Sequence, residues 1–449
     1  MALVERRALG QGLDTYEAPA AAAPLERRAP EPRGPLTLRE ALALALLHSP
    51  ELAQSAWEVR VAEAKMLQAG LGPNPELEAG LEGFGGTRDK RALGGAEATL
   101  SLGYTIELGG KRAKRLRAAE AEGRLAAWDY EAKRLDVLTA TTKAFAEVLA
   151  GQERLALQDE LAALAERVLR NVEDQVAAGK VSPIEEHKAR AEAASARIAR
   201  EQARHRLAAA RRRLATSWGG AEPAFERAVG RLGPDLSDPA PHSDWAALAA
   251  LLRQNPDVDR WADELAQRQA ALELEKANRI PDLTLAPGLG YFGESNAFGW
   301  LFGLALPLAV RNRNEGAILE AGYKAAKAAE ERRGAQSRAL AELAEACGEL
   351  AAAAAEANGI QAEVLPAAQA AFDAATEGFR QGKFRFIEVL DAQRTLFEAR
   401  VGLIGAQAEY QKALADLERL IGQSILPTQA QPPAGLEPAG GSLERRSQQ

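Results

Sequence analysis

Hydrophobic and polar positions alternate strictly in four short segments of the chain. These segments cover about residues 75–85, 96–107, 281–292 and 297–308. Period-two alternation predicts β-strands with one apolar face and one polar or small face. Strands of about ten residues are long enough to cross a membrane when tilted. In lipid, only a closed barrel satisfies the backbone of every strand, and four strands are too few, so we expect several copies of the chain to share one barrel.

The two faces of the predicted strands differ in chemistry. We expect the apolar face to contact lipid through Leu77, Leu100, Leu102, Leu283, Leu285, Trp300 and Phe302. The opposite face carries Glu76, Glu78, Glu82, Glu97, Asp282 and Thr284 and is expected to line a wet lumen. Tyr104, Tyr291 and Trp300 are candidates for aromatic girdles at the membrane surfaces. A soluble hairpin packed on helices would give the same alternation.

The rest of the chain is dominated by helix-forming residues. The segments of about 111–178 and 314–381 each predict one long helix, ~100 Å at 1.5 Å per residue. Shorter helices are expected over about 37–70 and 183–218, and together they match one long helix in length. Helices of this length must pack side by side along a rod or tube.

The chain contains an internal duplication. SPELAQSAWEV at Ser49 resembles NPDVDRWADEL at Asn255, and AGKVSPIEEHKAR at Ala178 resembles QGKFRFIEVLDAQR at Gln381. The period is about 200 residues, far longer than that of solenoid repeats. We therefore divide the chain into a disordered N-terminal segment (1–34), a first repeat (35–230), a linker (231–246), a second repeat (247–424) and a disordered C-terminal tail (425–449).

Other features argue against several functional classes. Gly288, Gly290 and Gly293 match the letters of a dinucleotide-binding turn, but they lie in a predicted strand and no helix opens after them. The net charge of −7 and the isoelectric point near 5.5 argue against nucleic-acid binding. One cysteine, two methionines and four scattered histidines argue against a dedicated soft-metal site within this chain. We expect no enzyme activity and no cofactor.

The combination of motifs resembles the TolC-like outer membrane efflux proteins. The resemblance rests on the duplicated helix–strand–strand–helix–helix order, NPEL opening a strand, ELGGKR after the second strand, and GKFRFIEVLDAQRTL after the long helix. Within that family, LGPNPELEAGLEGFGG and ELGGKR are most similar to the cobalt–zinc–cadmium branch. The resemblance implies a mainly α chain whose homotrimer forms a 12-stranded β-barrel on a long α-helical barrel.

The same resemblance implies a function and partners. It implies a passive duct in the cell outer membrane, in contact with outer membrane lipid, with a long periplasmic part. It also implies a periplasmic adaptor and an inner-membrane resistance–nodulation–division pump as partners. Heavy-metal cations are the expected cargo; drug or solvent efflux and type I protein secretion through the same duct are the alternatives. A soluble coiled-coil scaffold is the alternative from another class.

The resemblance also implies roles for residues near the helix ends. Glu388 and Asp391 lie three residues apart on one helix and match acidic positions that line the tunnel entrance. Phe379 matches a residue that helps to lock the closed tip, with plain helix packing as the alternative. Glu185 and Lys188 occupy the matching positions of the first repeat. The expected adaptor contacts are Gly179, Lys180, Val181, Ser182, Gly382, Lys383, Phe384 and Arg385.

Two features are less simply explained by the resemblance. The cluster Lys111, Arg112, Lys114, Arg115 and Arg117 opposes the dipole at a helix N-terminus, so we expect anionic headgroups or a solvated face around it. The N-terminal residues carry no recognisable signal peptide. Because an outer membrane protein must be exported, we expect the native leader to be missing from this chain or wrongly delimited.

Overall fold

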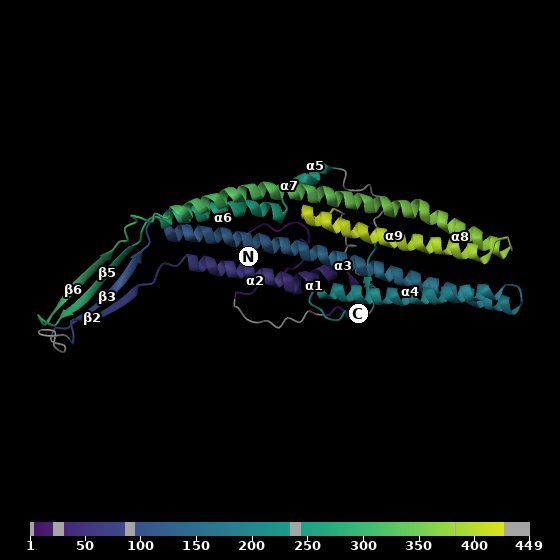
Figure 1. The fold of residues 1–449 in the computed structure, drawn as a ribbon, viewed down its shortest axis with the longest axis horizontal. Helices are drawn as coiled ribbons and strands as arrows, with labels where there is room; N and C mark the ends of the chain where they lie inside the picture. Colours follow the sequence, from purple (N-terminus) through teal and green to yellow (C-terminus); the bar gives the residue numbers. More distant parts are fainter. Residues whose placement is uncertain (1–3, 21–30, 86–94, 234–243, 382, 426–449) are drawn as a thin grey trace, which may run out of the picture.

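The fold is an elongated bundle of helices with a β-sheet at one end, as seen in a computed structural model (Figure 1). The structure describes residues 4–20, 31–85, 95–233, 244–381 and 383–425. The helices run side by side along the length of the molecule and end in two hairpins at the end opposite the sheet (Figure 1). We call this end the tip; it comprises residues 172–190 and 375–391.

The first repeat places two short helices beside one long helix. Its elements are β1 (Gly34–Thr37), α1 (Leu38–His48), α2 (Pro50–Ala69), β2 (Glu76–Glu82), β3 (Glu97–Ile106), α3 (Lys111–Ala177), α4 (Pro183–Thr216) and β4 (Phe225–Val229). Thr37 and Glu40 form a reciprocal capping box at the start of α1. The single helix expected over 37–70 is split, because Pro50 holds Ser49 in an extended conformation and Ser49 then caps α2.

The second repeat has the same order of elements. They are α5 (Trp245–Leu252), α6 (Pro256–Asn278), β5 (Leu283–Phe292), β6 (Ala297–Ala305), α7 (Glu315–Gly359), η2 (Ile360–Val364), α8 (Leu365–Arg380) and α9 (Phe386–Ile421). The helix expected over 314–381 is interrupted by η2, a π-helical turn. Pro366 lies two residues after η2 and has no N–H to donate. A wider turn before this proline relieves the clash between its ring and the preceding turn of the helix.

The strands form one antiparallel sheet that joins the repeats. Its order is β2-β3-β5-β6, so β3 of the first repeat pairs with β5 of the second. A second, two-stranded parallel sheet pairs β1 with β4. No local pattern in the sequence indicates this small sheet, whose strands lie about 190 residues apart.

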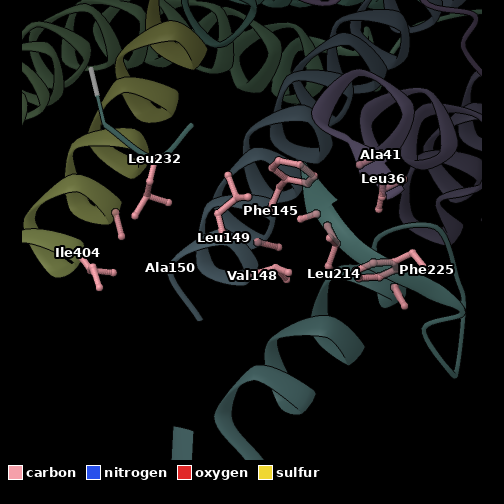
Figure 2. Close-up of a cluster of buried hydrophobic side chains, with 14 of the residues drawn as sticks. Leu36, Ala41, Phe145, Val148, Leu149, Ala150, Leu214, Phe225, Leu232 and Ile404 are labelled. Carbon is pink, nitrogen blue, oxygen red and sulfur yellow. The ribbon is translucent and has the colours of Figure 1, made fainter. Parts of the chain in front are cut away.

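The main apolar core lies halfway along the helices and draws on both repeats. Figure 2 shows Phe145 and Leu149 of α3 with Leu214 of α4, Phe225 of β4 and Ile404 of α9. All of them are buried. Burial of such side chains stabilises by about 1.5–3 kcal/mol each. This core fixes α3 between α4 and α9, and it therefore holds the two repeats in one body.

Residues 4–20 differ from the disorder expected for the N-terminal segment. Tyr16 and Ala18 are buried against the helices. The backbone of this segment bonds to residues of several helices, including a bond from the Tyr16 N–H to the Leu46 carbonyl at 3.1 Å. Composition alone did not reveal this packing, because the partners, such as Leu46 for Tyr16, lie in distant parts of the sequence.

Candidate functional sites at the two ends of the molecule

The four-stranded sheet presents one strongly apolar and exposed face. The register places Leu100 opposite Leu289, and Leu289 opposite Trp300 on the next strand. Trp300 is 85% exposed and Phe302 is 72% exposed. Leu77, Leu100 and Leu102 are also exposed, whereas Leu283 and Leu285 are half-buried near the helices. A contiguous apolar face of this kind marks a surface that is covered by lipid or by another protein.

The opposite face of the sheet is polar or small. Glu78 lies opposite Ser101, and Thr99 lies opposite Gly290. A Cβ atom on Gly288 would come within 2.7 Å of the Leu100 carbonyl oxygen. The glycines that match a nucleotide-binding motif therefore allow close packing between strands, and Gly293 donates its N–H to the Ala96 carbonyl at 2.9 Å.

Both outer edges of this sheet are open. Within the described residues, β2 pairs only with β3, and β6 pairs only with β5. Unpaired edge strands present rows of N–H and C=O groups that pair readily with another chain. The apolar face and the open edges together require a partner at this end of the molecule.

Lys111, Arg112 and Arg115 of the basic cluster after β3 bind groups within the chain, whereas Arg117 is exposed, as expected for a solvated face. Lys111 is buried and donates to Asp282 at 2.7 Å. Arg115 pairs with Glu107 at 2.7 Å. Arg115 also donates to the carbonyls of Ala69 and Leu71, and Arg112 to that of Gly70. These carbonyls lie at the C-terminal end of α2, where cations are favourable because of the helix dipole.

At the tip, each repeat ends in a tight turn between two helices. Gly179 has a φ of +68°, a conformation that favours glycine, and Ser182 caps α4. In the second repeat, the N–H groups of Lys383 and Phe384 donate to the Gly378 carbonyl. A Cβ on Gly378 would overlap the Phe384 ring, so this ring rests directly on α8. Gly382 lies outside the described residues.

The turn residues expected to contact an adaptor are solvent-accessible. Lys180, Ser182, Lys383, Phe384 and Arg385 are exposed, and Val181 is half-buried. They lie at the end of the molecule farthest from the sheet (Figure 1). The geometry thus leaves both turns accessible to another protein.

The two acidic residues of the second repeat differ in their partners. Glu388 lies in the first turn of α9, is exposed, and has no ion-pair partner among the described residues. Asp391 is exposed and accepts from Arg394 at 2.8 Å. In the first repeat, Glu185 pairs with Lys188 at 3.0 Å. Glu388 is therefore the carboxylate of these three that carries an unpaired negative charge.

Phe379 links the two hairpins of the tip. It packs in one apolar cluster with Val172 of α3, Ala189 of α4 and Leu390 of α9. The cluster contains residues of both repeats. Phe379 is therefore placed to hold the hairpins together, and this contact is itself helix packing.

A series of ion pairs joins α3 to α9 and was not found from the sequence. Asp136 pairs with Arg419 at 2.6 Å, Lys143 with Asp416 at 2.5 Å, and Glu147 with Lys412. The bond from Lys412 lowers the pKa of the Glu147 carboxyl. The partners lie some 270 residues apart, and neither sequence segment alone signals the pairing.

The described residues were also considered as metal ligands and as membrane-spanning helices by their chemistry and length. Among the described residues, no three His, Cys, Asp or Glu side chains are grouped so that they could hold a metal ion. None of the helices in the described ranges has the length and apolar character needed to span a membrane.

Comparisons with known proteins give consistent matches. The model of the family described as outer membrane efflux protein matches residues 41–220 and 247–423. The cobalt-zinc-cadmium resistance protein CzcC of Cupriavidus metallidurans is 37% identical over 393 residues, 88% of this chain and 91% of CzcC. The nickel and cobalt resistance protein CnrC of the same organism is 29% identical over 302 residues, 65% of this chain and 67% of CnrC.

The fold is similar to that of a solved outer membrane protein. VceC of Vibrio cholerae superposes with a TM-score of 0.70 at 22% identity, over 87% of this chain and 97% of VceC. Together with the family match, this likeness assigns the mainly α fold with a small β part to the same class of structure.

Proposed function

The chain belongs to the outer membrane efflux protein family, and we propose that it is the outer membrane channel component of a tripartite efflux system that exports heavy-metal cations. Three copies would form a passive duct that connects a periplasmic adaptor and an inner-membrane pump to the exterior. The observation that carries this proposal is the four-stranded sheet with an exposed apolar face and two open edges. The family to which the chain belongs and the names of its relatives support export as the direction of transport and metal cations as the cargo.

Trimer formation would satisfy both open edges of the sheet. If β6 of one copy pairs with β2 of the next, three four-stranded sheets close into a barrel without a free edge. β3 and β5 have ten residues each and β6 has nine, which suits tilted strands that cross a bilayer. The apolar face would then contact lipid and the glutamate-bearing face would line the lumen.

The helices next to the edge strands support the same contact. α7 follows β6 and exposes Leu319 and Tyr323, while α2 precedes β2 and exposes Val61 and Leu67. A neighbouring copy that pairs with the sheet edges would bring these apolar residues together. The helices would then continue the barrel as a tube on the periplasmic side.

We assign the periplasmic entrance to the tip. Glu388 and Asp391 of three copies would form an acidic ring that attracts cations, and Phe379 would stabilise the closed arrangement by packing between hairpins. Heavy-metal cations as cargo are supported by the relatives CzcC and CnrC, whose names specify resistance to cobalt, zinc, cadmium and nickel. The turns at Gly179–Ser182 and Lys383–Arg385 would receive the adaptor, together with Gly382, which lies outside the described residues.

Native mass spectrometry of the protein extracted from outer membranes tests the assembly. We expect a mass of three times 47.9 kDa and recovery in the outer membrane fraction. A monomer that is released from membranes by alkali would contradict the proposal and favour a coiled-coil scaffold.

A metal-tolerance assay tests the cargo. Cells that lack only this chain should lose tolerance to cobalt, zinc or cadmium and regain it when the chain is restored. Loss of tolerance to drugs or solvents, with metal tolerance unchanged, would keep the duct and overturn the cargo.

A further inference from the structure

Residues 4–20 form a strap that crosses several helices of the bundle. The strap is irregular, and its contacts are largely made by its main chain. Two residues of the strap, Tyr16 and Ala18, are buried. They lie in one apolar cluster with Leu46 of α1, Leu52 of α2 and Leu135 of α3. The strap therefore belongs to the folded body of the chain.

The strap binds to a buried ion pair on α3. Glu131 and Arg134 are paired at 2.7 Å, and each side chain is only 2% exposed. The Arg7 N–H donates to Glu131 at 2.8 Å, and Arg134 donates to the carbonyls of Leu9 at 2.8 Å and Arg7 at 3.1 Å. A buried ion pair is stable only when its remaining polar atoms are also bonded, and the strap supplies these bonds.

The same strap contacts both repeats. On the first repeat, the Tyr130 hydroxyl donates to the Tyr16 carbonyl at 2.6 Å, and Arg60 of α2 donates to the Ala18 carbonyl at 2.8 Å. On the second, Arg7 pairs with Asp259 of α6 at 2.5 Å.

The strap also binds the C-terminal end of the second repeat. The Leu9 N–H donates to the Gly422 carbonyl at 2.8 Å, directly after the end of α9. The strap thus bonds to α2, α3, α6 and the residue after the end of α9.

We propose that the strap is a clamp that fixes the two repeats to one another, and that Glu131 and Arg134 are its receptor. The receptor lies about 30 Å from the sheet end of α3 and about 65 Å from the tip, at 1.5 Å per residue. The clamp thus fixes the half of the helices next to the sheet and leaves the tip unrestrained. This inference concerns the single chain and does not depend on the cargo.

Two glycines of the strap provide a matched pair of variants. Gly10 and Gly12 both have positive φ, at +71° and +88°, so alanine is strained at either position. A Cβ on Gly10 would lie 2.8 Å from Leu138 of α3, within the receptor surface, whereas a Cβ on Gly12 meets nothing within 4 Å. Gly10→Ala should therefore release the strap and Gly12→Ala should leave it bound.

Amide hydrogen exchange of the full-length protein measures this release. In the unmodified chain we expect the Arg7, Leu9 and Tyr16 amides to be protected, because all three donate to fixed acceptors. Gly10→Ala should speed their exchange by about tenfold or more, with a smaller rise in α6, while Gly12→Ala stays within about threefold of the unmodified chain.

Three results would overturn the clamp. They are unprotected strap amides in the unmodified chain, equal effects of the two substitutions, and a release of the strap that leaves exchange in α6 unchanged. Exchange at the tip should be the same in all three proteins. Failure of these expectations would leave the proposed duct untouched, since metal tolerance and trimer mass are measured separately.

Discussion

At the scale of single residues, side chains at the tip hold the two hairpins of one chain together. Phe379 packs against Val172 and Ala189 of the first repeat. Phe384, five residues later, rests on Gly378 of its own hairpin. The two aromatic residues thus differ in what they join, although they lie in the same turn region.

This difference leads to a prediction about the closed tip. Phe379→Ala should remove about 1–2 kcal/mol of packing between the hairpins, because the ring is half-buried. We expect a higher single-channel conductance than that of the unmodified protein. Phe384→Ala is the matched control and should leave the conductance unchanged, since its ring rests on Gly378 of its own hairpin. Equal conductance of both variants would refute the role of Phe379.

The ion pair of Glu147 and Lys412 gives a prediction about pH. The bond from Lys412 lowers the native pKa of Glu147, so the pair stabilises the fold above the unfolded pKa near 4.5 and this contribution is lost as pH falls through the native pKa. Lys412→Met should cost about 0.5–1 kcal/mol at neutral pH, because the pair is partly exposed.

Thermal unfolding in detergent measures this cost. The difference in melting temperature between the unmodified protein and Lys412→Met should be constant from pH 6 to 8 and should become smaller below pH 4.5. Lys188→Met removes the partner of Glu185 in an exposed pair and should give a smaller difference in melting temperature. A difference in melting temperature that becomes larger at acidic pH would contradict the lowering of the Glu147 pKa by Lys412.

At the scale of elements, consecutive residues of β3 point to opposite faces of the sheet. Leu100 belongs to the apolar face, in line with Leu289 and Trp300, and Ser101 belongs to the polar face opposite Glu78. Leu100→Arg should cost about 2–4 kcal/mol if it faces the middle of a bilayer, and Ser101→Arg should be tolerated in a wet lumen.

The amount of assembled trimer in outer membranes tests this pair of substitutions. We expect a strong loss for Leu100→Arg and near-normal assembly for Ser101→Arg. The opposite order of severity, or equal loss, would mean that the apolar face of the sheet does not contact lipid.

The elements also show which parts of the fold could be predicted from sequence. Alternation and turn glycines are local signals, so the strands and the tip hairpins were predicted close to their observed positions. The break at Pro50 and the π-helical turn before Pro366 were missed, although each proline was visible, because helical composition on both sides concealed the interruption.

Contacts between distant segments could not be predicted. The pairing of β1 with β4, the ion pairs between α3 and α9, and the binding of Arg7 to Glu131 depend on three-dimensional packing. The acidic pair was predicted by resemblance, but the capture of Asp391 by Arg394 was not. The binding of Arg112 and Arg115 to carbonyls at and just after the end of α2 was also not predicted, since these segments come close only in the folded chain.

At the scale of the whole molecule, the two ends have different tasks. The sheet end presents an apolar surface with open edges, and the tip presents charged turns about 100 Å away, the length of α3. The shared core around Phe145 and the continuous helix α3 connect the two ends. In the proposed duct, lipid would surround one end while cations enter at the other.

The ion selectivity of single channels in planar bilayers tests most directly whether the protein forms a cation-conducting duct. We expect the unmodified protein to insert and to conduct cations in preference to anions. Glu388→Gln combined with Asp391→Asn should reduce this preference, because it removes both carboxylate charges and leaves the charge of Arg394 without the carboxylate of Asp391. Glu185→Gln, which removes the carboxylate charge paired with Lys188 in the first repeat, should have a smaller effect.

A cation preference that falls in the double variant and persists in Glu185→Gln would support a duct whose entrance is controlled by the second repeat. A pore whose selectivity is the same in all three proteins would contradict the acidic entrance. Failure of the unmodified protein to form any pore would contradict the duct itself.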